Sequence, residues 1–396
     1  MNYLLIEQAD FQQQLKPFTF TRPIAEIRVG IMTIKEKWAH LLKEELSYIT
    51  SAYLSEKYPK KVAEHNMLIN SAVCPTEELV ASIQMGAALK KDGILISFSA
   101  TAEEIDFFSP SEKLAQAAEY DGDLTIISEK WHIFQHNAAE IKSDFLLLTK
   151  GRISEKIEDT ATIVYGKENI FIEKGASIRA AIINAENGPV YIGKNAQVHE
   201  GAIIKGPFAL CEGSHVNMGA KIKGDSTIGP FSKVGGEVSN TVFFGYSNKG
   251  HDGFIGNSVI GEWCNLGADT NTSNLKNNYA NVKVWDYKEE QFNDTGLQFC
   301  GLMMGDHSKC GINTMFNTGT VVGVSANIFG GGFPRNFIPS FAWGGSAGFM
   351  TFQLLKAFEV AEKVMERRKI AFDKQERAIM NHHFEESQAD RFWENK

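Results

Sequence analysis

Residues 192–234 read IGKNAQVHEGAIIKGPFALCEGSHVNMGAKIKGDSTIGPFSKV, and an aliphatic residue recurs in this stretch at every sixth position. The series is Ile192, Val198, Ile204, Leu210, Val216, Ile222, Ile228 and Val234. A period of six fits neither an amphipathic helix, with roughly 3.6 residues per turn, nor a strand, with a period of about 2. It predicts a left-handed parallel β-helix, in which each hexapeptide forms one side of a three-sided coil and its aliphatic residue points inward.

The repeat continues on both sides of this stretch, with one interruption. It begins at Ile172 and Ile178, and after Val234 it resumes at Phe254, Ile260, Leu266, Met304, Cys310, Phe316, Val322 and Ile328. Val234 and Phe254 are 20 residues apart, which is not a multiple of six. We therefore expect a loop to leave the regular coil between these two residues, where it can present side chains to a groove.

The regions outside the repeat predict two further parts. Residues 1–155 alternate strand-like and helix-like segments, which indicates a small α/β domain with helices at 25–43 and 77–89 and strands at 67–70 and 94–98. We place the β-helix domain at 156–345 and a C-terminal helical tail at 346–396. One long amphipathic helix is expected from about 351 to 381, beside the β-helix or a partner subunit, with its basic stretch 366–369 on a solvated face.

Composition narrows the class of protein. The net charge of −8 argues against a nucleic-acid-binding surface, which needs clustered cations. Five cysteines with no CxxC pair favour a reducing compartment over a disulfide framework. The sequence shows neither a signal peptide nor an apolar run of about 18 residues, so we expect a cytoplasmic protein without a membrane span.

The interruption of the repeat carries a family resemblance. Residues 248–261 read NKGHDGFIGNSVIG, residues 265–270 read NLGADT, and SNL and VKV follow at 273–275 and 282–284. These segments resemble the acetyltransferase half of the GlmU family of bifunctional uridylyltransferase/glucosamine-1-phosphate acetyltransferases. They resemble still more closely the archaeal sugar-1-phosphate nucleotidyltransferases that carry an amino-sugar acetyltransferase tail. The resemblance covers most of residues 190–330.

The N-terminus resembles the other half of the same family. Residues 15–23, LKPFTFTRP, are similar to the L-x-P-L-T-x-x-x-P signature of sugar-nucleotide pyrophosphorylases, which implies nucleotide-binding roles for Pro17, Thr19 and Arg22. The glycine-rich phosphate loop that should precede the signature is replaced by EQADFQQQ at 7–14, whose backbone approaches a triphosphate less easily. The chain is most similar to a bacterial GlmU-like group with a reduced, Rossmann-like nucleotidyltransferase domain, and the resemblance implies an NTP (UTP or dTTP) with Mg²⁺.

The resemblance assigns the chemistry of acetyl transfer. His251 matches the catalytic base, and an imidazole suits that role because its unperturbed pKa of about 6.5 lies near the working pH. Asn274 matches a second catalytic residue that contacts the sugar, and Lys283 matches a lysine that binds the substrate phosphate. Each also has an interpretation without a functional role. His251 could be a solvated loop histidine, Asn274 could hold a corner of the β-helix, and Lys283 could be a solvated strand lysine.

Further positions complete the implied site. The substrate-binding set continues with Lys233, Lys249, Asn265 and Phe254, where the family usually has Tyr. Acetyl-CoA is expected at Ala268 and Asn313. The resemblance implies N-acetylation of an amino-sugar 1-phosphate, glucosamine-1-phosphate in the first place, by a homotrimer whose acetyl-CoA groove lies between subunits.

Two alternatives remain open at this point. Some β-helices bind zinc through three histidines, and His199, His215, His251 and His307 are candidates, but no histidine lies five residues from His251, so we predict no metal site. The second alternative is an enzyme that has lost its activity and is kept as a scaffold. Three departures from the family fit it: the altered N-terminal loop, Phe254, and the missing Arg after IGPF, where Lys233 is the nearest cation.

Overall fold

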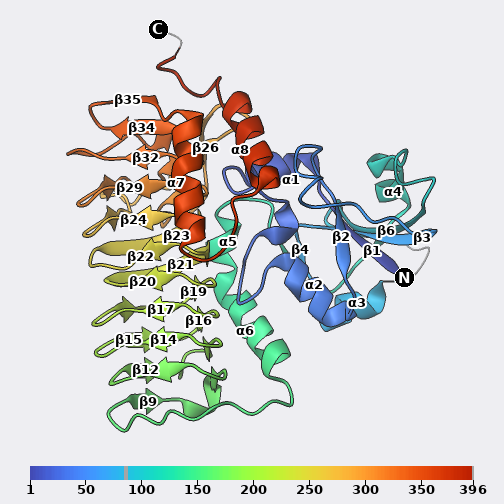
Figure 1. Ribbon diagram of the computed structural model, residues 1–396. Coiled ribbons are helices and arrows are strands. Elements are labelled where there is room, and N and C mark those ends of the chain that lie inside the picture. Colours follow the sequence, from blue (N-terminus) through green and yellow to red (C-terminus); the bar gives the residue numbers. More distant parts are fainter. Residues whose placement is uncertain (84–87, 395–396) are drawn as a thin grey trace. The chain divides into compact units, whose positions relative to one another are not determined.

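The computed structural model describes residues 1–83 and 88–394. The chain forms two compact units, which are considered separately. The N-terminal unit comprises residues 1–15, 21–27 and 32–129, and the β-helix unit comprises residues 16–20, 28–31 and 130–396 (Figure 1). In the described part of the chain, every helix is too short or too polar to cross a bilayer.

The N-terminal unit is a mixed α/β structure, as predicted. Its main sheet has the strand order β2 (Leu46–Ile49), β1 (Asn2–Ile6), β3 (His65–Asn70), β6 (Ile94–Thr101), β5 (Leu89–Lys91) and β7 (Ala118–Glu119). The first three strands are parallel, and β6 runs antiparallel to β3 and β5. A second small sheet pairs β4 (Val73–Cys74) with β8 (Thr125–Ile126). The predicted strands at 67–70 and 94–98 are therefore confirmed.

The helices of this unit are shorter than the sequence predicted. They are α1 (Ala9–Gln14), the 3-10 turn η1 (Ile24–Glu26), α2 (Ile34–Leu42), α3 (Glu77–Ser82) and α4 (Pro110–Gln116). The expected helix at 25–43 begins only at Ile34, because Thr33 and Glu36 form a capping box there. The expected helix at 77–89 was also wrong at its end, because α3 stops at Ser82 and Leu89 lies in β5. Residues 84–87 of that expectation lie outside the described residues.

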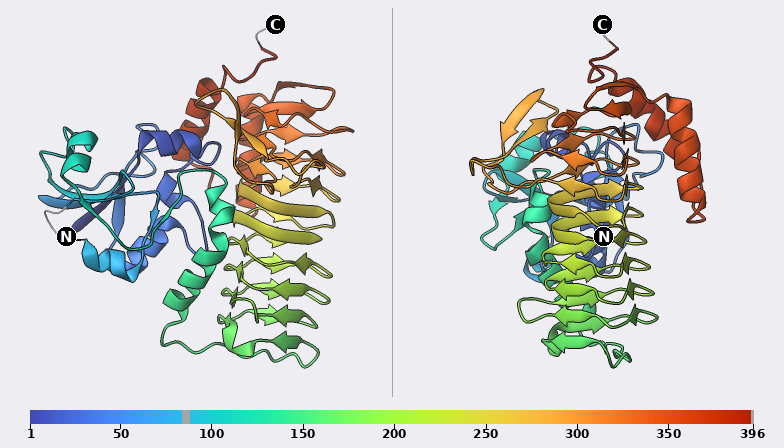
Figure 2. Two further views of the ribbon diagram at one scale, coloured as in Figure 1. Left: turned by 180° about the vertical axis from the view of Figure 1, so that it is seen from behind. Right: turned by 90° about the vertical axis from the view of Figure 1, so that its left-hand side faces the viewer.

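The β-helix confirms the hexapeptide prediction. Successive coils are stacked in parallel (Figure 2). Val198, Val216 and Val234 pair in one inward column, and Leu210 pairs with Ile228 in another. These five side chains are at most 1% exposed. Since each coil covers its apolar face with the next coil, the run of repeats forms a continuous core.

The strands of the β-helix unit form two large sheets and smaller pairs. The larger sheet covers two sides of the coil, because residues 237–238 pair with one column of strands and residues 242–243 pair with another. One sheet contains β10 (Ile170–Ile172), β13 (Val190–Ile192), β16 (Phe208–Leu210), β19 (Ser226–Ile228), β21 (Glu237–Gly245), β18 (Lys221–Ile222), β15 (Ile203–Lys205), β12 (Ile182–Asn184), β9 (Ile163–Tyr165), β23 (Phe254–Glu262), β28 (Met303–Met304), β31 (Val321–Val322) and β33 (Phe337–Ile338). A second contains β11 (Ser177–Ile178), β14 (Gln197–Val198), β17 (His215–Val216), β20 (Lys233–Val234), β22 (Asn248–Lys249), β24 (Asn265–Leu266), β29 (Lys309–Cys310), β32 (Asn327–Ile328), β34 (Ala342–Gly345) and β35 (Gly348–Thr351). The rest are the pair β25 (Asn271–Thr272) and β30 (Met315–Phe316), the hairpin β26 (Lys283–Asp286) with β27 (Gln291–Asp294), and the turn η2 (Lys167–Asn169).

The register at the interruption differs from the prediction at one residue. Val238 pairs with Ile255, and both side chains are fully buried, whereas Phe254 pairs with Glu237 and is only half-buried. The expectation that Phe254 points inward was therefore wrong. The coils here have irregular lengths, since Lys249 pairs with Val234 after 15 residues, so a strict count of six fails.

Residues 28–31 and two helices bind one flank of the β-helix. The helices are α5 (His132–Gln135) and α6 (Asn137–Thr149), which lie upstream of the predicted boundary at 155. Ile31 and Ile141 pack against Ala209 and Cys211. The buried side chain of Asn137 accepts hydrogen bonds from Gly30 N (2.7 Å) and Thr227 Oγ1 (3.1 Å) and donates to Asp225 O (3.0 Å).

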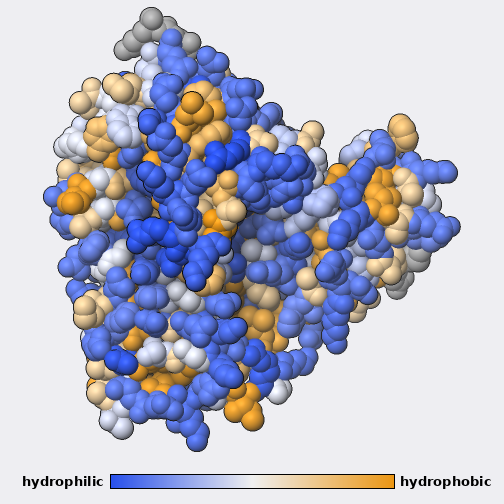
Figure 3. Space-filling model, in the orientation of Figure 1, coloured by the Kyte–Doolittle hydropathy of each residue, from blue (hydrophilic) through white to orange (hydrophobic). Residues whose placement is uncertain are grey.

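The C-terminal tail forms two helices where one was predicted. α7 (Leu354–Glu366) and α8 (Lys374–Glu386) are separated by residues 367–373, in which Lys369 has a positive φ of 58°. α7 buries Ala357, Ala361 and Met365 in an apolar cluster with Trp263 and leaves its other face to solvent. Figure 3 shows mainly hydrophilic side chains over this region of the β-helix unit.

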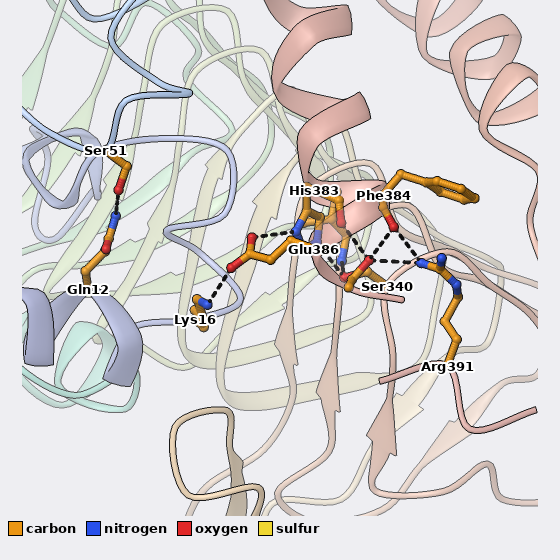
Figure 4. A network of polar contacts seen from close by, with 10 residues as sticks. Gln12, Lys16, Ser51, Ser340, His383, Phe384, Glu386 and Arg391 are labelled. Atoms are coloured by element: carbon orange, nitrogen blue, oxygen red, sulfur yellow. Dashed lines mark hydrogen bonds and ion pairs between the residues drawn. The ribbon is translucent and has the colours of Figure 1, made fainter. Parts of the chain in front are cut away.

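A polar network anchors α8 (Figure 4). The His383 ring lies 2.8 Å from Ser340 Oγ and 3.7 Å from a carboxylate oxygen of Glu386, which pairs with Lys16 at 3.1 Å. His383 and Ser340 are at most 1% exposed, so this arrangement of Ser, His and Glu has no access to a substrate. It holds the tail on the β-helix.

Asn137 provides a stability test for this packing. Asn137→Ala should lower the free energy of unfolding by about 1–3 kcal/mol, because it leaves the buried Gly30 N–H without its acceptor, whereas the Thr227 hydroxyl keeps its bond to Gly30 O. Chemical denaturation followed by circular dichroism measures this change. The control is Asn184→Ala, whose side chain bonds to Glu186 two residues along the chain; it should change stability by less than about 0.5 kcal/mol. Equal effects of the two substitutions would contradict the role of Asn137.

Candidate functional site

A cavity of about 750 Å³ lies in the β-helix unit, where the interruption of the repeat meets the end of α7. Its walls come from five parts of this unit: the β-helix strands, the loop around His251, the corner at 263–268, Ile312 and the chain after α7. The lining residues are Asn217, Lys233, Tyr246, Asn248, Gly250, His251, Trp263, Cys264, Asn265, Leu266, Gly267, Ala268, Lys309, Ile312, Val364, Arg367 and Arg368. His251, Lys233, Asn265 and Ala268, four of the sequence-predicted site residues, are therefore brought together.

The β-helix register explains this grouping. Lys233 pairs with Asn248, Asn248 with Asn265, and Asn265 with Lys309, so these polar side chains form one outward row across consecutive coils. Their neighbours in sequence point inward, as strand alternation requires. Residues far apart in the chain thus share one wall of the cavity.

The loop that carries His251 is tightly constrained. Asn217 Nδ2 donates to Gly250 O at 2.7 Å, and Asp269 N donates to Asp252 O at 3.1 Å. Gly253 has a φ of 109°, and a Cβ at this position would overlap the Thr270 carbonyl, so only glycine fits. The imidazole of His251 itself is exposed at the edge of the cavity.

Lys249 lies inside the β-helix, which corrects its predicted role in substrate binding. It stands in the inward column next to Val234 and is 1% exposed. Its ammonium donates to His251 O (2.9 Å), Asp252 O (3.0 Å) and Gly235 O (3.4 Å). Burial lowers the pKa of Lys249 to about 8. Lys249 therefore acts on the His251 loop from beneath and cannot reach a substrate in the cavity.

The charged lining of the cavity is entirely cationic among the residues described. Lys233, Lys309, Arg367 and Arg368 line it together with His251, and no Asp or Glu does. Arg368 is fixed by a hydrogen bond of 2.9 Å to Phe231 O. Burial lowers the pKa of Lys309 to about 8. Such a wall favours an anionic ligand with more than one negative group.

The two arginines were missed by the sequence analysis. Residues 366–369 were expected on a solvated face, but α7 ends at Glu366 and the following turn directs Arg367 and Arg368 to the cavity. Arg368 is near enough to act on His215, whose pKa is lowered mainly by burial and further by Lys233, His199 and Arg368. The signal in the sequence was a run of basic residues, 367–369, at the end of an expected helix, which could have indicated an anion-binding site.

The wall beside the arginines is aromatic. Tyr246 and Trp263 stack with ring centroids 4.2 Å apart and planes within 9°, and Phe231 extends the stack at 5.4 Å from Tyr246. All three occupy corners with positive φ, at 54°, 62° and 57°. Corner residues of successive coils are therefore held above one another as a flat apolar surface.

Other predicted residues lie outside this cavity. Asn274 Nδ2 donates to Asn257 Oδ1 at 2.8 Å, and both Asn274 and Phe254 border Gly256 on a neighbouring side of the coil. Asn313 supports Ala268 through its backbone, whose N–H donates to the Ala268 carbonyl at 2.8 Å. Lys283 lines a different cavity of the same unit.

The predicted nucleotide-binding residues are buried. Thr19 and Arg22 are 1% and 5% exposed, and Pro17 is also buried. Within the β-helix unit, Phe18 packs on Phe244 with ring centroids 5.2 Å apart, which explains why the signature segment is enclosed. None of the three predicted residues lines a described cavity of the N-terminal unit.

A cavity of about 530 Å³ does exist in the N-terminal unit. It lies at the carboxyl ends of β1 and β3. The two strands that follow β1 in the chain, β2 and β3, lie on opposite sides of β1 in the sheet, and ligands of such sheets usually bind at this point. Glu7, Gln8, Asp10 and Asn70 line it, and no Lys or Arg of the described residues does. Burial raises the pKa of Glu7, which accepts a hydrogen bond from Ile24 N at 2.7 Å.

No zinc-type cluster is formed in residues 1–83 and 88–394. This part of the chain contains no group of three or more His, Cys, Asp or Glu side chains arranged to hold a metal ion. His199 and His215 are neighbours, with ring centroids 5.6 Å apart, but His307 stacks on Trp263 instead.

Comparison with known proteins supports the family resemblance. Residues 3–153 match a family model described as sugar nucleotidyl transferase. The bifunctional protein GlmU of Methanococcus maripaludis is 27% identical over 293 residues, which are 72% of this chain and 61% of that protein. A bifunctional sugar-1-phosphate nucleotidylyltransferase/acetyltransferase of Sulfurisphaera tokodaii is 30% identical over 146 residues, 36% of each chain.

Coverage of these relatives is partial. GlmU of Wigglesworthia glossinidia brevipalpis is 27% identical over 42% of this chain, and the match spans 35% of that protein. Among solved structures, a point mutant of the Bacillus cereus N-acyltransferase AntD, in complex with dTDP-4-amino-4,6-dideoxyglucose and coenzyme A, is 14% identical. It covers 52% of this chain and 91% of its own, with a TM-score of 0.21.

Lys249→Met tests whether the buried ammonium holds the His251 loop. Methionine retains an apolar contact in the inward column but leaves the His251 carbonyl without its Lys249 donor and the Asp252 carbonyl with the Asp269 N–H alone. Hydrogen exchange measured by mass spectrometry should quicken about ten-fold or more for peptides covering 250–253, with the remaining coils unchanged. The matched control is Lys221→Met, an exposed strand position. Unaltered exchange in the loop would refute this role of Lys249.

Proposed function

We propose that this chain, which has a sugar nucleotidyltransferase domain at residues 3–153 and GlmU-like bifunctional relatives, acetylates an amino-sugar 1-phosphate with acetyl-CoA. Glucosamine-1-phosphate is the first candidate acceptor. One observation carries the proposal: the exposed imidazole of His251 borders a cavity whose charged walls are all cationic among the described residues. That combination suits a general base that acts on acetyl-CoA, whose thioester is attached to a phosphate-bearing carrier.

The reaction assigns His251 the role of general base. The sugar amine attacks the thioester carbonyl carbon and forms the new N–C bond, while His251 takes the proton that the amine loses. The C–S bond then breaks as the amide forms, and protonated His251 passes that proton on to the departing sulfur, which restores the neutral imidazole. Lys249 keeps the backbone of the loop in place during these steps through its bonds to the His251 and Asp252 carbonyls.

The cationic wall fits the anionic part of coenzyme A. That cosubstrate carries a diphosphate and a 3′-phosphate, which match the fork geometry of Arg367 and Arg368 and the point charges of Lys233 and Lys309. Ala268 and Asn265 line the same cavity and suit the pantetheine arm. Binding energy from this remote part would position the thioester at His251.

The acceptor and the assembly remain as the resemblance implies them. We propose a homotrimer in which Asn274 and Phe254 contact the acceptor sugar, because both lie beside Gly256 on one outer side of the coil. The same side exposes Ile163, Ile203 and Met315, and such a row of apolar residues fits an interface with a second copy.

His251→Ala tests the catalytic assignment. We expect kcat for acetyl-CoA with glucosamine-1-phosphate to fall about 100-fold or more, since the base is lost, with the melting temperature unchanged because the side chain is exposed. Free thiol release is the measurement. His199→Ala is the control and should retain full activity. A robust rate in His251→Ala disproves the assignment, and no turnover of any amino sugar by the unaltered chain favours the scaffold alternative.

Removal of the 3′-phosphate tests the cationic wall. Acetyl-dephospho-CoA should show a KM raised about ten-fold or more with little change in kcat, because the lost contact binds cosubstrate and transition state equally. Arg367→Gln with Arg368→Gln should raise KM for acetyl-CoA but leave KM for acetyl-dephospho-CoA much less affected. A double variant that loses the same factor on both thioesters would contradict recognition of that phosphate by the arginines.

A second candidate activity is nucleotidyl transfer by the N-terminal unit. The family match and the cavity at the switch point of the sheet favour it. Glu7 and Asp10 supply carboxylates at that cavity, and Mg²⁺ prefers oxygen ligands of this kind, so we propose that an NTP, UTP or dTTP, binds there with Mg²⁺. Pyrophosphate release with sugar 1-phosphates tests this activity, and its absence with both nucleotides would exclude it.

A further inference from the structure

The β-helix unit contains a second, larger cavity of about 850 Å³. It lies between the β26–β27 hairpin, the chain at 335–337 and the segment that follows α8 (β26 is labelled in Figure 1). Its size is within the range of small-molecule sites. The residues that line it are Lys276, Lys283, Trp285, Glu290, Phe292, Thr318, Arg335, Asn336, Phe337, Ala389, Asp390 and Phe392, and none belongs to the His251 cavity.

Two cations of this cavity have no carboxylate partner. Neither the Lys283 ammonium nor the Arg335 guanidinium forms an ion pair within the described part of the chain. The Arg335 guanidinium carbon lies 4.8 Å from the centroid of the Phe392 ring, which also lines the cavity. Lys276 is held by the Asn281 carbonyl at 2.7 Å. Glu290 and Asp390 also line the cavity, so its walls carry both signs of charge. The positive charge available to an anion is that of Lys283 and Arg335.

Aromatic rings form the rest of the wall. Trp285 stacks on Phe337 with centroids 4.3 Å apart and planes within 11°, and Phe292 meets Trp285 edge-on at 5.3 Å. The indole Nε1–H of Trp285 is buried, and no acceptor for it exists among the residues that the structure describes. A buried donor without a partner is unfavourable, and a ligand acceptor would recover that loss.

We propose that this cavity binds a nucleoside diphosphate group, free or linked to a sugar. Lys283 and Arg335 take the two phosphates, the aromatic wall takes the base, and a carbonyl of the base accepts the Trp285 indole N–H. A sugar phosphate alone satisfies the cations but leaves the rings uncovered, so the nucleotide is the better match. The site is separate from acyl transfer at His251 and does not depend on it.

Calorimetric titration of the full chain with UDP and dTDP tests the proposal. The titration is done without Mg²⁺, on which the NTP site proposed for the N-terminal unit depends. We expect at least one of the two nucleotides to bind at one site per chain under these conditions, with uridine, thymidine, inorganic phosphate and glucosamine-1-phosphate binding at least ten-fold more weakly. Lys283→Met with Arg335→Met should weaken nucleotide binding ten-fold or more, and Trp285→Phe, which keeps the ring but removes the N–H, should weaken it several-fold. The melting temperature of each variant checks that it is folded.

The matched control is Lys233→Met with Arg368→Met in the His251 cavity, which should leave nucleotide affinity within two-fold. Four results would overturn the proposal: no binding of either nucleotide, binding unaffected by the Lys283 and Arg335 changes, glucosamine-1-phosphate binding as tightly as UDP at the same residues, or displacement of UDP by coenzyme A at the same residues. None of these depends on catalysis, so a failure of acetyl transfer leaves this test intact.

Discussion

The stacking of one coil on the next is the constraint on which the β-helix depends. Each coil must place an apolar side chain inward at each side, because its backbone already bonds to the neighbouring coils and the inward residues are closed to solvent. Lys249 breaks this rule at the coil that precedes the His251 loop. Its ammonium is accommodated because the carbonyls of the loop accept its hydrogens. The exception to the core pattern is therefore also what fixes the candidate base.

The repeat was predictable because a period of six is a local, redundant signal, repeated from Ile192 to Val234 with every step buried as expected. Its register beyond the interruption was not, since the coil lengths there vary and the inward position passes from Phe254 to Ile255. The late start of α2 had a visible local signal in Thr33 and Glu36. Recruitment of residues 28–31 to the other unit had none, because it depends on tertiary bonds to Asn137.

The site was predictable to a similar extent. His251, Asn265, Ala268 and Lys233 were found through the resemblance, and the register brings them to one cavity. Arg367 and Arg368 could not be assigned, because their direction follows from where α7 ends and how it packs. Lys249 was predicted from its charge. Its inward position could not be predicted, because it depends on a coil length of 15 residues that the sequence does not reveal. Lys283 belongs to a cavity formed by residues from four distant segments, which no local pattern indicates.

The central claim is that the cavity beside His251 holds an acyl-CoA. A crystal structure of the chain with bound coenzyme A tests it most directly. The account predicts phosphates against Arg367, Arg368 and Lys309, with the thiol directed toward the imidazole of His251. Coenzyme A bound elsewhere on the chain, or bound here with its thiol pointing away from His251, would contradict the account.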